Sequence, residues 1–219
     1  MFDHMVAPYL ATPTTEVLHP LGAFALATVR VTDYDAADAA HSAVMAKMSI
    51  PASDELTAEL DGATEWLDLP ADEILLAALT RTIARTLGEG VVPIDIASER
   101  GCLLDAVPMV CATGPQAGPT EVLGTVHRTL AGASERVAAA PSEVYFNYIG
   151  EVPEETVSVQ ETPPGLGHAL EVRVYRAAGD VHIDWWYDTS RFESYTIEEL
   201  TEQFPRALIE MTSDALPPQ

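Results

Sequence analysis

The stretch between residues 70 and 98 most narrowly limits what this chain can fold into. Across Ala71–Leu87 the apolar residues recur at the spacing of one helix face, with Pro70 in the first turn and Gly88 just past the end. The following run Val91–Ser98 (VVPIDIAS) is short, apolar and β-branched, which predicts a buried strand. A helix followed at once by a buried strand is a building unit of layered α/β domains. The helix stripe consists of Leu75, Leu76, Leu79, Ile83 and Leu87.

The rest of the chain continues this mixture of patterns. Strands are predicted at Phe24–Thr32, Glu143–Ile149 and Val157–Gln160, and a hairpin at Leu170–Tyr175 and Val181–Tyr187 that turns at Gly179 and Asp180. Helices are predicted at Asp33–Met48, at Pro51–Leu60 with Ser53 as N-cap, at Thr120–Ala139 and in a last segment capped by Thr196. We expect Pro205 to break or kink the last helix. Residues 100–119 hold three glycines and three prolines, which predicts a loop except for the apolar VPMVCA at residues 107–112. Strands separated by helices and followed by a hairpin predict an α/β domain with a mixed sheet.

The length of the chain suits one substantial domain. Of its 219 residues 47% are hydrophobic and only 21% are charged, which excludes a natively unfolded chain. The pattern predicts an irregular lead-in at residues 1–23, a single domain at 24–213 and a tail at 214–219. Cys102 and Cys111 are too few for a disulfide framework and lack the spacing of a redox or zinc site, so we expect free thiols in a reducing compartment.

Acidic residues outnumber basic ones by a wide margin. The chain has 34 Asp and Glu against 11 Lys and Arg, a formal net charge of −23, which is the wrong sign for binding nucleic acid or anionic membrane surfaces. No apolar run approaches the roughly 18 to 20 residues of a membrane span, and the N-terminus lacks a basic segment followed by an apolar one. We therefore expect a cytoplasmic protein.

The charge is also unevenly distributed. Residues 81–150 carry 5 basic and 7 acidic groups, whereas residues 1–80 carry 2 and 13 and residues 151–219 carry 4 and 14. An anionic ligand or acidic partner would therefore dock best on the middle third. The candidate docking residues are Arg81, Arg85, Arg100, Arg128 and Arg136. The alternative is a merely acidic, solvated surface.

The stretch Pro141–Gly150 (PSEVYFNYIG) resembles the P-x-x-x-x-FNYLG signature of condensation and, especially, epimerization domains of nonribosomal peptide synthetases. Ala71–Arg85 resembles the D-x-LL-x-AL-x-x-A helix of that family, and Leu170–Tyr175 with Gly179–Phe192 resembles its closing hairpin. The resemblance covers about residues 24–213, all of it the family's C-terminal lobe. It implies a chloramphenicol-acetyltransferase-like fold, a two-layer sandwich with a mixed β-sheet covered by helices.

The same resemblance implies a site. The Asn of FNYLG lies near the reaction centre of the epimerization family, so Asn147 is a candidate for contact with a ligand or for lining a substrate tunnel, with Tyr148 and Gly150 as neighbours. These residues also fit a plain strand that ends in a glycine turn, which is the structural alternative.

One motif of the family is missing from this chain. The H-H-x-x-x-D-G motif, whose second His acts in proton transfer, belongs to the N-terminal lobe, and the six histidines of this chain occur singly. Because such chemistry needs a positioned His, we expect no catalysis by the chain alone and assign no catalytic residue. At the positions where the family has its EGHGR and TVGWFT motifs, this chain has the different sequences ASERG and AVPMVCA.

Other residue patterns are weaker. His182 and Asp184 fall on one face of a predicted strand, but a metal site would need a third ligand, so a solvated strand face is favoured and no metal is assigned. Trp185 and Trp186 point to opposite faces, which predicts one in the core and one at a surface or interface. The chain has no P-loop, G-x-S-x-G or G-x-G-x-x-G motif.

Three hypotheses follow for the function. The first is a stand-alone, non-catalytic C-terminal lobe that acts by association in nonribosomal peptide or other secondary-metabolite biosynthesis, as a homodimer or as a heterodimer with an N-lobe-type protein. The second is a split condensation or epimerization enzyme completed in trans, with acyl or peptidyl thioesters delivered on the phosphopantetheine arm of a peptidyl carrier protein. The third is a small-molecule binder that uses a vestigial tunnel. No cofactor of its own is expected.

Overall fold

The computed structural model describes most of the chain. The described residues are 27–35, 44–51, 53–97, 103–115, 117–133, 141–153, 163 and 165–217. The elements, in chain order, are β1 (Met45–Ile50), α1 (Asp54–Leu67), α2 (Ala71–Thr86), β2 (Gly90–Ala97), β3 (Leu103–Cys111), α3 (Pro119–Gly132), β4 (Val144–Glu151), β5 (Leu170–Ala177), β6 (Asp180–Asp188) and α5 (Ser194–Ser213). No helix in this part of the chain has the length and apolar character needed to span a bilayer.

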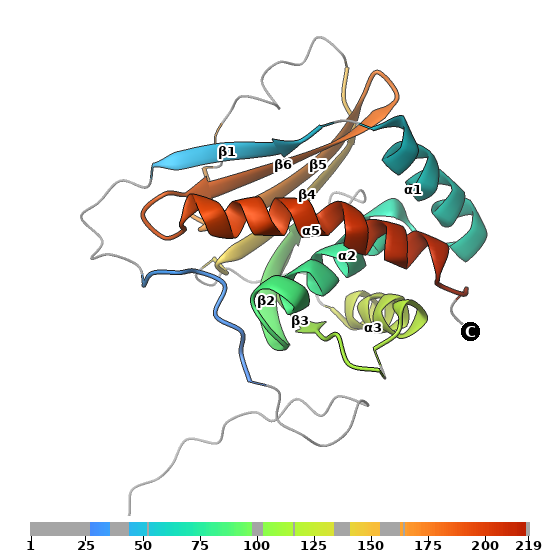
Figure 1. Ribbon diagram of the computed structural model, residues 1–219, viewed down its shortest axis with the longest axis horizontal. Coiled ribbons are helices and arrows are strands. Elements are labelled where there is room, and N and C mark those ends of the chain that lie inside the picture. Colours follow the sequence, from blue (N-terminus) through green and yellow to red (C-terminus); the bar gives the residue numbers. More distant parts are fainter. Residues whose placement is uncertain are drawn as a thin grey trace, which may run out of the picture.

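The strands form one mixed sheet in the order β1-β6-β5-β4-β2-β3 (Figure 1). β4 runs parallel to both of its neighbours, β2 and β5, and the other neighbouring strands pair antiparallel. The predicted antiparallel hairpin β5–β6 is present, but it turns one residue earlier than predicted, at Ala178 and Gly179, which adopt positive φ angles of 54° and 93°. The mixed α/β architecture expected from the sequence is confirmed.

The helices form a second layer over one face of the sheet. Figure 1 shows α5 lying along the sheet, with α2 and α3 beside it. The apolar stripe of α5 is completely buried at Leu200, Phe204 and Leu208, and the Phe204 ring meets Trp185 of β6 edge to face at 5.7 Å. This face of the sheet and the helices share a single hydrophobic core.

The last helix is continuous through Pro205, so the predicted break is wrong. A proline inside a helix removes one backbone hydrogen bond and costs about 3 kcal/mol. The apolar residues on either side of Pro205 are fully buried, and this burial offsets the loss. The predicted cap is also wrong, because α5 begins at Ser194. The Thr196 hydroxyl donates instead to Asp33 Oδ1 at 3.1 Å, and Asp33 Oδ2 accepts the backbone N–H of Glu193 at 2.8 Å.

Three further segments differ from their predicted structures. Within Phe24–Thr32, the described residues make only an isolated parallel bridge, between Thr28 and Val91, and no strand. The predicted helix Asp33–Met48 is wrong over its last residues, because Met45–Ile50 is an edge strand paired with β6. The predicted loop at residues 100–119 contains strand β3, also at an edge, where Pro108 is tolerated.

The remaining predicted elements occur in the structure, with ends that differ by up to seven residues, or lie outside its described part. Ser53 caps α1 as predicted, accepting the N–H of Leu56, although the helix continues to Leu67. The helix α3 ends at Gly132, before the predicted end at Ala139. The predicted strand Val157–Gln160 and the lead-in at residues 1–23 lie outside the described residues. Cys111 is buried without a disulfide, and burial raises the pKa of its thiol to about 12.

Candidate functional site

The motif strand β4 divides its side chains between the two faces of the sheet. Phe146 and Tyr148 belong to the hydrophobic core beneath the helices, whereas Asn147 points to the opposite face. Gly150 has a φ of 77°, and the register with β5 shifts between Tyr148 and Gly150, so a bulge ends the motif. Asn147 and Tyr148 therefore lie on opposite faces of the sheet, and their role in ligand contact stays a prediction. Gly150 has a structural reason to be glycine.

The face opposite the helices, called the polar face here, carries rows of aligned polar and aromatic side chains. One row consists of Asp95, Tyr145, Glu171, Trp186 and Lys47, running across β2, β4, β5, β6 and β1. The next consists of Asn147, Arg173, Asp184 and Ser49, and a third of Tyr175 and His182. The strand register alone therefore brings together residues that are far apart in the sequence.

Asn147 is part of a charged network at the centre of the polar face. Its Nδ2 donates to Glu171 Oε1 at 2.9 Å, and Arg173 Nε donates to the same oxygen at 2.8 Å. The Glu171 side chain is 2% exposed and that of Arg173 is 8% exposed, so the two charges are buried as a pair. The Arg173 guanidinium and the Lys47 ammonium each lie 5.6 Å from the ring centre of Trp186. The network holds the Asn147 amide in a fixed orientation.

Asp184 is the centre of a second cluster on this face. The Ser49 hydroxyl donates to its Oδ1 at 2.5 Å and the Tyr175 hydroxyl to its Oδ2 at 3.3 Å, while Lys47 Nζ lies 3.8 Å away. Burial and the Asp184 charge raise the pKa of Tyr175 to about 12, so this phenol stays a hydrogen-bond donor. His182 stacks on Tyr175 with ring centres 5.1 Å apart. His182 and Asp184 share a face as predicted, and the described residues contain no group of three metal-ligating side chains.

Asp95 joins four segments at one end of the polar face. Its carboxylate accepts the Ala106 N–H at 2.6 Å, the Ser142 N–H at 3.0 Å and hydroxyl at 2.8 Å, and His168 Nε2 at 2.8 Å. Burial acts to raise the pKa of Asp95, but these hydrogen bonds outweigh it and hold the pKa below its usual value. The His168 ring stacks on Tyr145 at 4.7 Å, and its Nδ1 is buried without a hydrogen-bond partner. Ser142 bonds Asp95 and not His168, so the three residues do not form an activated nucleophile.

The predicted docking arginines are largely engaged within the chain. Arg81 is 3% exposed and donates to the carbonyls of Ala112 and Ala117, so it ties α2 to the segment before α3. It is therefore buried and does not reach the surface, where a docking residue would lie. Arg85 pairs with Glu210. Arg128, 57% exposed, lies 3.6 Å from Glu121. Arg100 and Arg136 lie outside the described residues. The docking role stays a prediction, and Arg85 and Arg128 are the described residues on which it can be tested.

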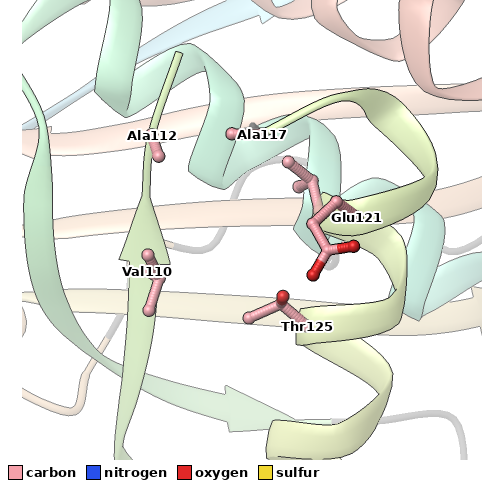
Figure 2. Close-up of a pocket in the computed structure, with 6 residues that line it drawn as sticks. Val110, Ala112, Ala117, Glu121 and Thr125 are labelled. Carbon is pink, nitrogen blue, oxygen red and sulfur yellow. The ribbon is translucent and has the colours of Figure 1, made fainter. Parts of the chain in front are cut away.

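A shallow pocket lies between β3 and α3 (Figure 2). Figure 2 shows Val110 and Ala112 on the strand side facing Glu121 and Thr125 of α3. The space measures about 220 Å³ including the solvent at its mouth, and little of it is enclosed by the chain. It therefore gives no support to a small-molecule binder. Its lining residues are Val110, Ala112, Ala117, Glu121, Val122 and Thr125.

Sequence reasoning identified Asn147, His182 and Asp184 but missed their partners. Glu171 and Arg173 lie in a segment correctly predicted as a strand, and an alternation of charged and apolar residues over Leu170–Tyr175 was a usable signal. Asp95 and His168 meet only through the parallel pairing of β2, β4 and β5, for which the sequence has no local signal.

Comparison with known proteins agrees with the architecture. No protein-family model matches the chain. Curated relatives are a component of the phenolphthiocerol/phthiocerol polyketide synthase of Mycobacterium tuberculosis and its counterpart in Mycobacterium bovis, each 35% identical over an alignment of 219 residues that covers 78% of this chain. The chain spans 15% of the length of these relatives.

Solved structures match the fold at low sequence identity. The epimerization domain from the third module of tyrocidine synthetase B has a TM-score of 0.64 at 14% identity, covering 88% of this chain and 53% of that one. The condensation domain of Monacolin K polyketide synthase has a TM-score of 0.57 at 12% identity, covering 92% and 56%. A cyclization-docking bidomain of a nonribosomal peptide synthetase from Sorangium cellulosum has a TM-score of 0.60 at 11% identity, covering 86% and 46%. The chain therefore has the chloramphenicol-acetyltransferase-like fold of a condensation-domain C-terminal lobe and is homologous to part of a polyketide synthase.

Proposed function

We propose that this chain is an association lobe in polyketide or nonribosomal peptide biosynthesis, which docks against a second condensation-type lobe and does not catalyse by itself. The observation that carries the proposal is the extent of the structural match. The match takes in 88% of this chain but only 53% of the epimerization domain. The complementary half of such a domain would have to come from another polypeptide segment.

The polar face is the surface we assign to this association. The helices cover the other face of the sheet, and on the polar face Ser49, Asn147 and His182 are at least partly exposed, so we place the second lobe there. Its innermost charges are already paired, which avoids the cost of leaving an unpaired charge in an interface. Lys47 is 31% exposed, and Ile149, at the bulge that ends β4, is 37% exposed. These residues would supply direct contacts.

The contacts of the histidines support a non-catalytic role. His168 is held by Asp95, and His182 is stacked on Tyr175. A general base must reach the proton that it removes, and neither ring is paired with a nucleophile among the described residues.

The test is the mass of the chain in solution by light scattering, alone and mixed with an N-lobe-type condensation protein. A complex of the two proteins supports the proposal, and Ile149→Glu should weaken it. Ile209→Glu on α5 is the matched control, because Ile209 is 39% exposed, and should leave the complex intact. The proposal is overturned if the chain does not bind the N-lobe protein, whether the chain is a monomer or a homodimer.

A split enzyme completed in trans is the second candidate, and the fixed Asn147 amide favours it. In a reconstituted complex supplied with a carrier-bound thioester, Asn147→Ala should lower turnover about tenfold or more, as removal of an oriented polar group does. Light scattering at the same concentrations measures any loss of complex separately. Carrier docking is tested with Arg85→Glu and Arg128→Glu. Arg81 is not used for this test because it is buried, and a substitution there would change folding. Turnover that is unaffected by Asn147→Ala, or absent from the wild-type complex, counts against this candidate.

A further inference from the structure

Helix α1 presents an outward face that carries carboxylates and one exposed tryptophan. The stripe consists of Asp54, Ala58, Asp61, Glu65 and Asp68, all exposed, and beside it lie Glu55, Gly62 and Trp66, whereas Glu59 accepts a hydrogen bond from Thr212 of α5. Lys, Arg and His are absent from the helix. Trp66 is 61% exposed in the chain alone. Tryptophan is one of the residues that most often anchor protein interfaces, where it becomes buried by the partner. Figure 1 shows α1 on the flank of the molecule, beside the C-terminal end of α5.

The C-terminal end of α1 combines features that are unfavourable in the chain alone. The end of a helix carries a partial negative charge, which cations stabilise. Here Glu65 and Asp68 occupy this end and no basic residue stands in the last turn. Asp68 also has a φ of 54°, a conformation that favours glycine. A cation placed beside Trp66 would relieve the electrostatic part of this conflict.

The chain itself binds one guanidinium on this face. Arg176 of β5 donates to Asp61, and this contact, against the opposing effect of burial, raises the pKa of Arg176. The other described cations are engaged elsewhere, since every described Lys and Arg except Arg206 contacts a carboxylate of this chain. Among the described residues, no Lys or Arg forms an ion pair with Glu65 or Asp68.

We propose that the outward face of α1 binds an arginine-bearing helical segment of a partner protein, with Trp66 as its anchor. A guanidinium can stack on the indole ring while it donates to a neighbouring carboxylate, which an ammonium does less well. Gly62 leaves room for close approach, because a Cβ at that position would meet no atom within 4 Å. This surface is separate from the polar face, and the inference does not depend on the proposed function.

The test uses a labelled synthetic helical peptide with arginines along one face and follows its binding by fluorescence anisotropy. At low ionic strength, near 0.01 M, charges act over about 30 Å, and the peptide should bind. Trp66→Ala should weaken binding about tenfold, which corresponds to about 1.4 kcal/mol for an interface anchor. The double change Glu65→Gln with Asp68→Asn should weaken it as well.

Matched controls separate this face from general attraction to an acidic protein. Tyr195→Ala removes an aromatic side chain of α5 that is 69% exposed, and Glu198→Gln with Glu202→Gln removes two charges from exposed positions of the same helix. Both should leave peptide affinity unchanged. The proposal is overturned if the α5 variants weaken binding as much as the α1 variants do, or if wild type fails to bind. A peptide with lysine in place of arginine should bind less tightly.

Discussion

At the residue scale, the Asp95 carboxylate links several segments of the chain on the polar face. Its two oxygens accept hydrogen bonds from β3, from the segment before β4 and from His168 before β5. We expect Asp95→Asn to lower the free energy of unfolding by about 3 kcal/mol. The amide replaces one accepting oxygen with an NH2 group, so donors that bind this oxygen lose their acceptor. Urea denaturation measures the change. Glu202→Gln on the exposed side of α5 is the control, and a loss below about 1 kcal/mol for Asp95→Asn would contradict this role.

The lowered pKa of Asp95 also predicts a dependence of stability on pH. The carboxyl has an ordinary pKa of about 3.9 when the chain is unfolded, and its hydrogen bonds hold the folded value lower. A depressed carboxyl pKa contributes stability that is fully present above the unfolded value and is lost as the pH falls through the folded one. Thermal unfolding should therefore show the gap between wild type and Asp95→Asn shrinking below about pH 4. A gap that stays constant down to pH 2.5 or so would contradict the assignment.

At the scale of elements, the sequence predicted segments with strong local signals and failed where pairing decides the structure. The stripe of α2 and the hairpin β5–β6 were readable because periodicity and turn residues are local. Met45–Ile50 looked like the end of an alanine-rich helix, yet it pairs with β6 and becomes an edge strand. Asn147 could be placed by resemblance to a motif, whereas its partner Glu171 depends on the β4–β5 register.

Two glycines in different elements should respond to alanine in opposite directions. Gly150 ends the motif strand with a φ of 77°, so Gly150→Ala should destabilise the fold by about 1 to 2 kcal/mol. Gly62 lies on the exposed side of α1 with open space around it, so Gly62→Ala should stabilise by about 0.5 to 1 kcal/mol. Urea denaturation of the two variants beside wild type checks both signs. Equal changes of the same sign would show that local backbone conformation does not govern these positions.

At the scale of the whole molecule, the net charge of −23 acts against the compact state. The described cations are almost all paired within the chain, so the remaining carboxylates repel one another across the surface. Raising the ionic strength from about 0.01 M to about 0.15 M shortens the screening length from about 30 Å to about 8 Å. Because this weakens the repulsion between carboxylates, the melting temperature should rise by about 2 to 4 °C. The same salt should weaken binding of the arginine peptide to α1, because there the charges attract. Scanning calorimetry and peptide anisotropy over one salt series measure both effects. If salt lowers the melting temperature, the paired charges on the polar face and not the surface repulsion dominate the electrostatics of this fold.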